Sequence, residues 1–215
     1  MSAIFSLDHA RRALFDASAH RFDAPTRTWI ASGDEARAGA ASEVLDAIGA
    51  ATWVQRESDH PLRVPIGVIG PRDATSAQMI VALEVGELLA DCGFLVICGG
   101  RQGVMQAVCE GVARNGGTSI GLLPEAEPSQ ANRFVSVAIA TGIGEARNAL
   151  IARASFCLIA IGDSFGTLSE VALGRQFGKL VIGLEGAPQI EGVFHAANAR
   201  AAILRVAEAV LRVES

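Results

Sequence analysis

Arg147 is the first side chain in this sequence whose type and setting favour ligand chemistry. It lies in the segment GEARNAL (144–150), which is predicted to open a helix that precedes a buried strand. An arginine that faces a ligand can hold a phosphate or a carboxylate through two parallel hydrogen bonds. A solvated surface arginine is the alternative, and the neighbouring Asn148 could be either a helix cap or a polar contact.

Glu170 ends a second segment of this kind, GDSFGTLSE (162–170), which follows the apolar run FCLIA. In one interpretation, Gly162 and Gly166 form a sharp phosphate-binding turn, Thr167 bonds a phosphate oxygen and Glu170 is catalytic. In the other, Thr167 and Glu170 are the two ends of a capping box, in which the Glu170 side chain bonds the Thr167 backbone N–H. The pattern of residues leaves both interpretations open.

A third segment, CGGRQGVM (98–105), joins a predicted strand to a predicted helix. Gly99 and Gly100 would allow the backbone to approach a ligand closely, and the helix after Gly103 would offer unpaired N–H groups to an anion. A tight turn without a ligand is the alternative. The segment is neither the G-x-G-x-x-G dinucleotide fingerprint nor a P-loop, since no GK[ST] follows.

These segments are positioned by a regular alternation of strands and helices that begins near Val64. Apolar strands are predicted in VPIGVIG, FLVIC, TSIGLLP, FVSVAIA, FCLIAIG and KLVIGL, with helices between most of them and a final amphipathic helix over about 196–212. A capping box from Thr75 to Gln78 is predicted to open the first of these helices. Continuous apolar strands that alternate with helices predict an α/β fold with a doubly wound, mostly parallel Rossmann-like sheet.

Four turns follow the predicted strands directly: GPRDAT, GGRQG, LPEAEP and GDSFGT. In a doubly wound sheet, ligands bind beyond the carboxyl ends of the strands. We therefore expect these turns to meet at one edge of the sheet and to form a single pocket. Arg72 and Arg101, from the first two turns, could then face the same ligand.

Residues 1–60 lack this alternation. They are predicted to form a small N-terminal accessory region, a hairpin plus a helix, in front of a Rossmann-like nucleotide-binding domain over residues 61–215. Two short strands are expected around a turn at 24–26, and Ser42 is expected to cap a helix that runs to about Glu57. The sequence does not indicate what this region does.

The composition argues against several classes of protein. The formal charge is −5 over 215 residues, so a nucleic-acid-binding surface, which needs clustered Lys and Arg, is not expected. No apolar run approaches the roughly 20 residues that span a membrane, and the histidines are scattered without metal-ligand spacing. The four cysteines form no CxxC pair and are predicted to be buried free thiols in a reducing compartment, so a cytoplasmic location is expected.

Four motifs, GGRQGVM, NGGTSIGLLP, TGIGEARN and GTLSE, together resemble a known superfamily. The run from Ile66 to about Glu185 is similar to the Rossmann-like family that includes the LOG ("lonely guy") cytokinin-nucleotide phosphoribohydrolases, often labelled lysine-decarboxylase-like. It is more similar still to a related group that includes the molybdenum-cofactor carrier proteins. The resemblance implies catalytic roles for Arg147 and Glu170. Taken with the strand-end turns, it predicts a set of residues that bind the phosphate or the nucleotide: Gly70, Arg72, Gly99, Gly100, Arg101, Gly103, Asn148, Gly162, Asp163, Ser164, Gly166 and Thr167.

The sequence departs from the LOG hallmark, which resembles PGGxGTxxE with an upstream Arg-Lys pair. The hallmark's PGG is here Gly162-Asp163-Ser164, and the lysine after the arginine is here Asn148. Asp163 is expected to repel a phosphate, because two unit charges about 6 Å apart cost roughly 2–3 kcal/mol at an effective dielectric constant near 20. Either Asp163 points away, or an arginine of a neighbouring turn offsets it, or the ligand is less anionic than a nucleoside monophosphate.

Two functions follow from the resemblance. The first is hydrolysis of the N-glycosidic bond of a nucleoside 5′-monophosphate, with Glu170 stabilising the positive charge that develops on the sugar and Arg147 positioning the nucleotide. The second is a non-catalytic carrier that binds an AMP-like or molybdopterin-like phosphorylated ligand in the same pocket. Neither function implies a resident cofactor or a metal. The resemblance also implies a homo-oligomer, with a dimer favoured.

Overall fold

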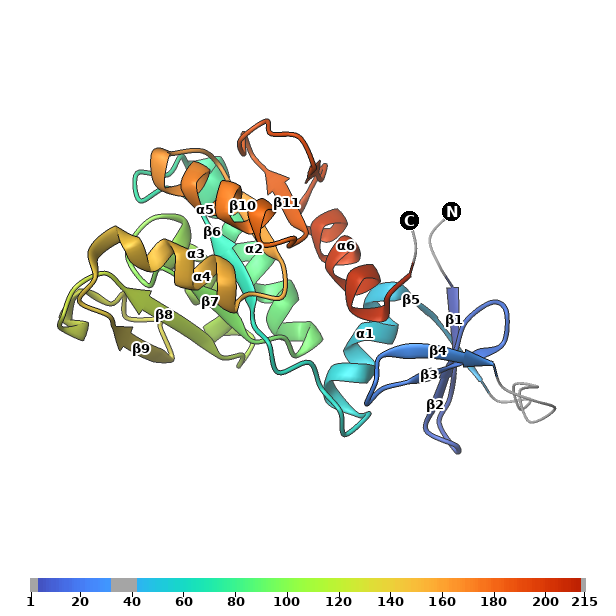
Figure 1. Ribbon diagram of the computed structural model, residues 1–215. Coiled ribbons are helices and arrows are strands. Elements are labelled where there is room, and N and C mark those ends of the chain that lie inside the picture. Colours follow the sequence, from blue (N-terminus) through green and yellow to red (C-terminus); the bar gives the residue numbers. More distant parts are fainter. Residues whose placement is uncertain (1–3, 32–41, 214–215) are drawn as a thin grey trace. The chain divides into compact units, whose positions relative to one another are not determined.

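The computed structural model of the chain describes residues 4–31 and 42–213. These residues form two compact units (Figure 1). Unit 1 comprises the described residues up to Leu62 and those from Leu204 onward, and unit 2 comprises Arg63–Ile203. The last helix, α6 (Ala199–Leu211), begins in unit 2 and ends in unit 1.

Unit 2 is built on a seven-stranded sheet in which all neighbouring strands are parallel. All residues of several central strands are buried, which explains why their sequences are continuously apolar. The predicted strands are confirmed, although a short edge strand, β12, was not predicted. In spatial order the strands are β12 (Val193–His195), β11 (Val181–Leu184), β10 (Leu158–Ile161), β6 (Ile66–Ile69), β7 (Val96–Cys98), β8 (Ser119–Leu123) and β9 (Val137–Ala140).

Helices cover both faces of this sheet, so the predicted doubly wound α/β fold is confirmed (Figure 1). On one face α2 (Ser76–Cys92) packs against α3 (Val104–Arg114), and on the other α4 (Asn148–Ala154) packs against α5 (Phe165–Gln176). The strands β6 to β9 follow one another in one direction and β10 to β12 in the opposite direction. The order therefore reverses between β6 and β10, and the crevice at such a reversal is where sheets of this type bind ligands.

The first turns of α2 and α5 are capped in different ways. At α2, the Thr75 side chain accepts a hydrogen bond from the Gln78 N–H (3.2 Å) and the Gln78 side chain accepts one from the Thr75 N–H (3.0 Å), so the predicted capping box is confirmed. At α5 the N-cap is Ser164, whose Oγ accepts a hydrogen bond from the Thr167 N–H at 3.1 Å. The capping-box interpretation of Thr167 and Glu170 is therefore wrong. Because the Thr167 N–H donates to Ser164, the Glu170 side chain does not cap the helix and is available to the cavity that it lines.

Unit 1 contains a five-stranded antiparallel sheet and one complete helix, α1 (Ala47–Arg56). The predicted hairpin is confirmed, but α1 is capped by Asp46, whose Oδ1 accepts a hydrogen bond from the Gly49 N–H at 2.8 Å. The predicted start at Ser42 is wrong because the residues that follow Ser42 pair with β1 as a strand. In spatial order the strands are β4 (Thr28–Ala31), β3 (His20–Asp23), β2 (Ala13–Phe15), β1 (Ile4–Asp8) and β5 (Glu43–Asp46).

Trp29, a partly buried residue of β4, contacts two core aromatic residues of unit 1. Its ring stacks on Phe5 with centroids 5.6 Å apart and lies 4.9 Å from the Phe22 centroid. Its indole N–H donates a hydrogen bond to the Leu211 carbonyl at 2.7 Å, which joins β4 to the end of α6. The chain of unit 1 is thus closed by a segment from the far end of the sequence.

Candidate functional site

The turns after β6, β7 and β10 meet in one cavity of about 660 Å³. This volume falls within the roughly 300–1,000 Å³ that small-molecule sites occupy. The cavity lies beyond the carboxyl ends of β6 and β10, where the strand order reverses. The predicted meeting of the strand-end turns is confirmed except for LPEAEP, which lies outside the lining and contributes through Glu125, an ion-pair partner of Arg101.

The residues that the sequence predicted to bind the ligand divide into two groups. Three glycines, Gly100, Gly103 and Gly162, lie outside the lining. The others line the cavity together: Gly70, Arg72, Gly99, Arg101, Arg147, Asn148, Asp163, Ser164, Gly166, Thr167 and Glu170.

The three excluded glycines shape the turns. A Cβ atom on Gly103 would lie 2.2 Å from the Arg72 carbonyl oxygen, one on Gly100 would lie 2.9 Å from the Gly121 Cα, and one on Gly162 would lie 2.4 Å from the Gln78 side chain. All three glycines have a positive φ. They are therefore required by backbone conformation and close packing.

Several residues of the lining were not singled out in the sequence. Two of them carry a recognisable signal. Glu145 stands two residues before Arg147 in the same motif, and Phe165 is an aromatic residue in an otherwise polar turn, where it is 94% exposed. The full set is Ile69, Pro71, Asp73, Met105, Glu145, Phe165 and Ser169.

Arg147 is positioned by a change in helix type. The helix that the segment GEARNAL (144–150) is predicted to open is divided into a 3₁₀ turn, η3 (Gly144–Arg147), and α4. Arg147 is the last residue of η3 and is only 5% exposed. Its guanidinium lies against Gly99, where an added Cβ atom would be 2.6 Å from Nη2, so the missing side chain of Gly99 makes room for it.

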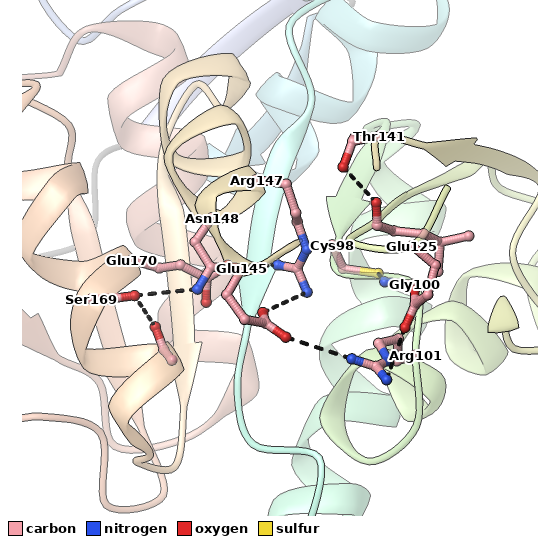
Figure 2. A network of polar contacts seen from close by, with 12 residues as sticks. Cys98, Gly100, Arg101, Glu125, Thr141, Glu145, Arg147, Asn148, Ser169 and Glu170 are labelled. Carbon is pink, nitrogen blue, oxygen red and sulfur yellow. Dashed lines mark hydrogen bonds and ion pairs between the residues drawn. The ribbon is translucent and has the colours of Figure 1, made fainter. Parts of the chain in front are cut away.

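Arg147 and Glu170 both line the cavity and contact each other, and Figure 2 shows them with Glu145 and Asn148. Glu170 is 6% exposed, and its Oε1 lies 3.5 Å from Arg147 Nη1, which also donates a hydrogen bond to Asn148 Oδ1. Arg147 Nε is buried and has no hydrogen-bond partner among the residues that the structure describes. Nε is covered by the protein, but Arg147 lines the cavity, so its terminal Nη atoms are the donors that a ligand can meet.

Burial raises the pKa of Glu170 from 4.5 to about 8. The Arg147 guanidinium opposes this shift and the Glu145 carboxylate adds to it. Arg147 does not cancel the effect of burial, because its single contact with Glu170 is long and the same nitrogen also serves Asn148. At neutral pH Glu170 is therefore mainly protonated and can donate a hydrogen bond to an anion.

The N-terminus of α5 forms a second polar feature of the cavity. The first two N–H groups of the helix, those of Phe165 and Gly166, have no carbonyl partner within the helix and carry the positive end of its dipole. The Ser164 hydroxyl caps the third and lies 2.9 Å from the Thr167 hydroxyl. This arrangement is suited to an anion, although Asp163 also lines the cavity here.

Within residues 4–31 and 42–213, no group of three or more His, Cys, Asp or Glu could hold a metal ion. The four cysteines are free and buried, as predicted. Burial raises the pKa of Cys157 to about 12, so this thiol stays protonated. In the same described ranges, no helix combines the length and the apolar character that a membrane crossing requires.

The chain is similar to proteins that handle the molybdenum cofactor. The family model described as the SLOG cluster4 family matches residues 63–211. The molybdenum cofactor binding protein of Rippkaea orientalis is 34% identical with a TM-score of 0.64, over 67% of this chain and 96% of that one. The Moco carrier protein of Chlamydomonas reinhardtii is 35% identical with a TM-score of 0.64, over 70% of this chain and 100% of that one.

Two further proteins extend these similarities. An uncharacterized protein of Archaeoglobus fulgidus is 39% identical over 128 residues, which are 60% of this chain and 84% of that protein. DNA processing protein A of Streptococcus pneumoniae has a TM-score of 0.54 at 16% identity, over 65% of this chain and 60% of that one, so it shares the fold alone.

Proposed function

The chain belongs to the SLOG cluster4 family, which agrees with the predicted resemblance to the LOG superfamily, and from this premise we propose that its cavity binds a phosphorylated heterocyclic ligand without converting it. One observation carries the proposal: the N-terminus of α5, Arg147 and Arg101 converge on one cavity at the reversal point of the sheet. The similar proteins from Rippkaea orientalis and Chlamydomonas reinhardtii, which bind or carry the molybdenum cofactor, support a molybdopterin-like ligand over an AMP-like one.

The ligand's phosphate is held at the start of α5. The N–H groups of Phe165 and Gly166 donate to its oxygens, and the Thr167 hydroxyl lies beside them. The Phe165 ring, which is 94% exposed at the rim of the cavity, offers a face on which a flat heterocycle stacks. A pterin and a purine both provide such a face.

Binding without conversion is supported by the state of Glu170. Because its pKa is raised to about 8, this side chain is mainly a neutral hydrogen-bond donor at pH 7. A neutral acid donates to a ligand oxygen and adds no negative charge to a cavity that already contains Asp163 and Glu145. The same neutral acid does not stabilise a cationic sugar.

Hydrolysis of a nucleoside 5′-monophosphate is the second candidate, and the Arg147–Glu170 pair favours it. In that reaction an ionised Glu170 would stabilise the oxocarbenium-like sugar and orient a water molecule. With a pKa of about 8, ionising Glu170 at pH 7 costs about 1.4 kcal/mol, which ligand binding has to offset.

One experiment separates the two functions. Purified protein and Glu170→Ala are incubated with a panel of nucleoside monophosphates, and the products are analysed by chromatography. In parallel, molybdopterin and AMP are tested for their effect on the melting temperature. A carrier gives no free base and is stabilised by molybdopterin, whereas free base from the wild type but not from Glu170→Ala establishes the hydrolase.

Arg147→Ala provides the test of the site itself. We expect it to abolish the stabilisation by ligand, while Arg114→Ala, at an exposed arginine of α3 that pairs with Glu87 and Glu110, preserves it. Stabilisation that survives Arg147→Ala, or the absence of stabilisation in every case, rejects the proposed site.

Oligomeric state and location are proposals of the same kind. We propose a homodimer, which light scattering of the purified protein tests, since a monomeric mass would reject it. We propose a cytoplasmic location from the four free thiols. Fractionation of cells tests it.

A further inference from the structure

Glu145 lies between two arginines at the wall of the cavity (Figure 2). Its Oε1 is 3.6 Å from Arg101 Nη1, and its Oε2 is 3.8 Å from Arg147 Nη2. Both distances exceed the roughly 2.7–2.9 Å of a charge-assisted hydrogen bond. The Glu145 side chain is 67% exposed, so this carboxylate neutralises both arginines without being firmly held by either.

The two arginines are held in place by other contacts. Arg101 Nη2 makes a shorter ion pair with Glu125 Oε1 at 2.9 Å. Arg147 is buried, packs against Gly99 and donates a hydrogen bond to Asn148. Removal of the Glu145 carboxylate would therefore leave both guanidinium groups at the cavity.

Arg147 also has an unused donor. Its Nε is buried and finds no hydrogen-bond partner among the described residues. Buried polar atoms without a partner are uncommon in folded proteins. Nε is covered by the protein, so a ligand in the cavity would meet Arg147 through its terminal Nη atoms, which lie next to Glu145 and Glu170.

We propose that Arg101 and Arg147 form an anion-binding subsite, separate from the α5 N-terminus, which the Glu145 carboxylate occupies until an anionic group of the ligand displaces it. The proposal rests on the proposed function, because it assigns a second anionic position to the same cavity. The subsite takes an oxyanion or a carboxylate. The ligand it implies carries a second anionic group besides the phosphate at α5.

Inorganic phosphate is the probe of choice, because its binding does not depend on the identity of the heterocycle. Phosphate is titrated into isotopically labelled protein, and two sets of NMR signals are followed. The backbone amides of Phe165 and Gly166 report on the α5 N-terminus, and the guanidinium N–H signals of Arg101 and Arg147 report on the subsite. Wild type, Glu145→Gln and Asp163→Asn are compared.

Glu145→Gln removes the internal competitor and keeps the shape of the side chain. We expect the arginine signals to respond to about tenfold less phosphate than in the wild type, a change of about 1.4 kcal/mol. The α5 amides should respond almost as before. Asp163→Asn is the matched control, since it removes the same unit charge from the α5 end of the lining and should tighten the response of the α5 amides alone.

The outcomes separate the two proposals. If the arginine signals of Glu145→Gln respond no more tightly than those of the wild type while the α5 amides still respond, the subsite is rejected and the proposed function stands. An equal gain at both positions in both variants indicates a general effect of charge and also rejects the subsite. If neither set of signals moves in any variant, the cavity binds no phosphate and both proposals fail.

Discussion

The two glycine turns at the cavity, CGGRQG after β7 and GDSFGT after β10, have similar sequences, but their glycines have different structural roles. In the first turn, Gly100 and Gly103 pack against neighbouring backbone, and the first N–H of α3, that of Val104, donates to the Pro71 carbonyl at 3.1 Å. In the second, Gly166 lines the cavity, and an added Cβ atom would meet nothing closer than 3.7 Å.

This difference shows that a glycine-rich turn after a strand has two separable uses. The β7–α3 turn uses glycine to let segments approach, and its contribution to the cavity is Gly99 and the Arg101 side chain. The β10–α5 turn uses a side-chain cap, Ser164, and keeps the first N–H groups of its helix open. Substitution of Gly100 or Gly103 in the first turn should therefore change stability, whereas substitution of Gly166 in the second should change ligand binding.

Gly103→Ala should have the largest effect. Its Cβ atom would lie 2.2 Å from the Arg72 carbonyl oxygen and 2.4 Å from that of Pro71, at a residue with φ of +69°. We expect a loss of at least about 4 kcal/mol in the free energy of unfolding, measured by chemical denaturation.

Gly166→Ala is the matched substitution in the other turn. It lies in the first turn of α5 with space around it, so the free energy of unfolding should stay the same or rise by about 0.5–1 kcal/mol. The added methyl group instead faces the cavity and should weaken phosphate binding, as followed by the Phe165 amide signal. Equal losses of stability in the two variants would contradict the distinction between the turns.

The pH dependence of stability tests the state of Glu170. Because the pKa of Glu170 is raised from 4.5 to about 8, the folded protein holds this proton more tightly than the unfolded chain. The resulting stabilisation is complete below pH 4.5 and is lost as the pH rises to about 8. Arg147 and Glu145 are the charged groups that act on Glu170.

Glu170→Gln removes this titration and keeps the size of the side chain. Relative to wild type, its free energy of unfolding should increase by about 3 kcal/mol between about pH 5 and 7.5. Denaturation of both proteins at several pH values measures the difference. A difference that does not change with pH would mean that Glu170 is already ionised in the folded protein.

Much of this fold could be predicted because its signals are local. Continuous apolar runs identified the buried strands, and the Thr75–Gln78 pair identified the start of α2. The strand-end turns then predicted the place of the cavity, because the carboxyl ends of parallel strands lie at one edge of the sheet. Arg147 and Glu170 needed the family resemblance as well.

The errors occurred where tertiary contacts decide between local alternatives. Ser164 and Thr167 are both suitable N-caps, and the sequence alone does not fix which of them begins α5. The residues after Ser42 become a strand only because β1 is available to pair with them. Glu145 was missed because its importance depends on Arg101, which reaches it from a different turn.

Two substitutions of Ser164 distinguish its role as the N-cap of α5 from the role of the α5 N-terminus in ligand binding. Ser164→Ala removes the acceptor for the Thr167 N–H and should cost about 1 kcal/mol in the free energy of unfolding. Ser164→Asp restores a good cap but adds a negative charge at the proposed phosphate position. It should therefore keep the stability of wild type and lose phosphate binding, which denaturation and the α5 amide signals measure. If Ser164→Asp still binds phosphate as wild type does, the anion is not held at α5.

Asp163→Asn should have the smallest effect. Asp163 is exposed, so solvent screens its charge, and the repulsion of a phosphate is weaker than at a buried site. We expect phosphate to bind about two- to fivefold more tightly at the α5 amides, with no change in stability. The gain in phosphate binding should become smaller as salt is added, because the added ions screen the repulsion between Asp163 and the phosphate. Unchanged binding at low salt would mean that Asp163 points away from the anion, and the departure from the LOG hallmark would then carry no electrostatic penalty.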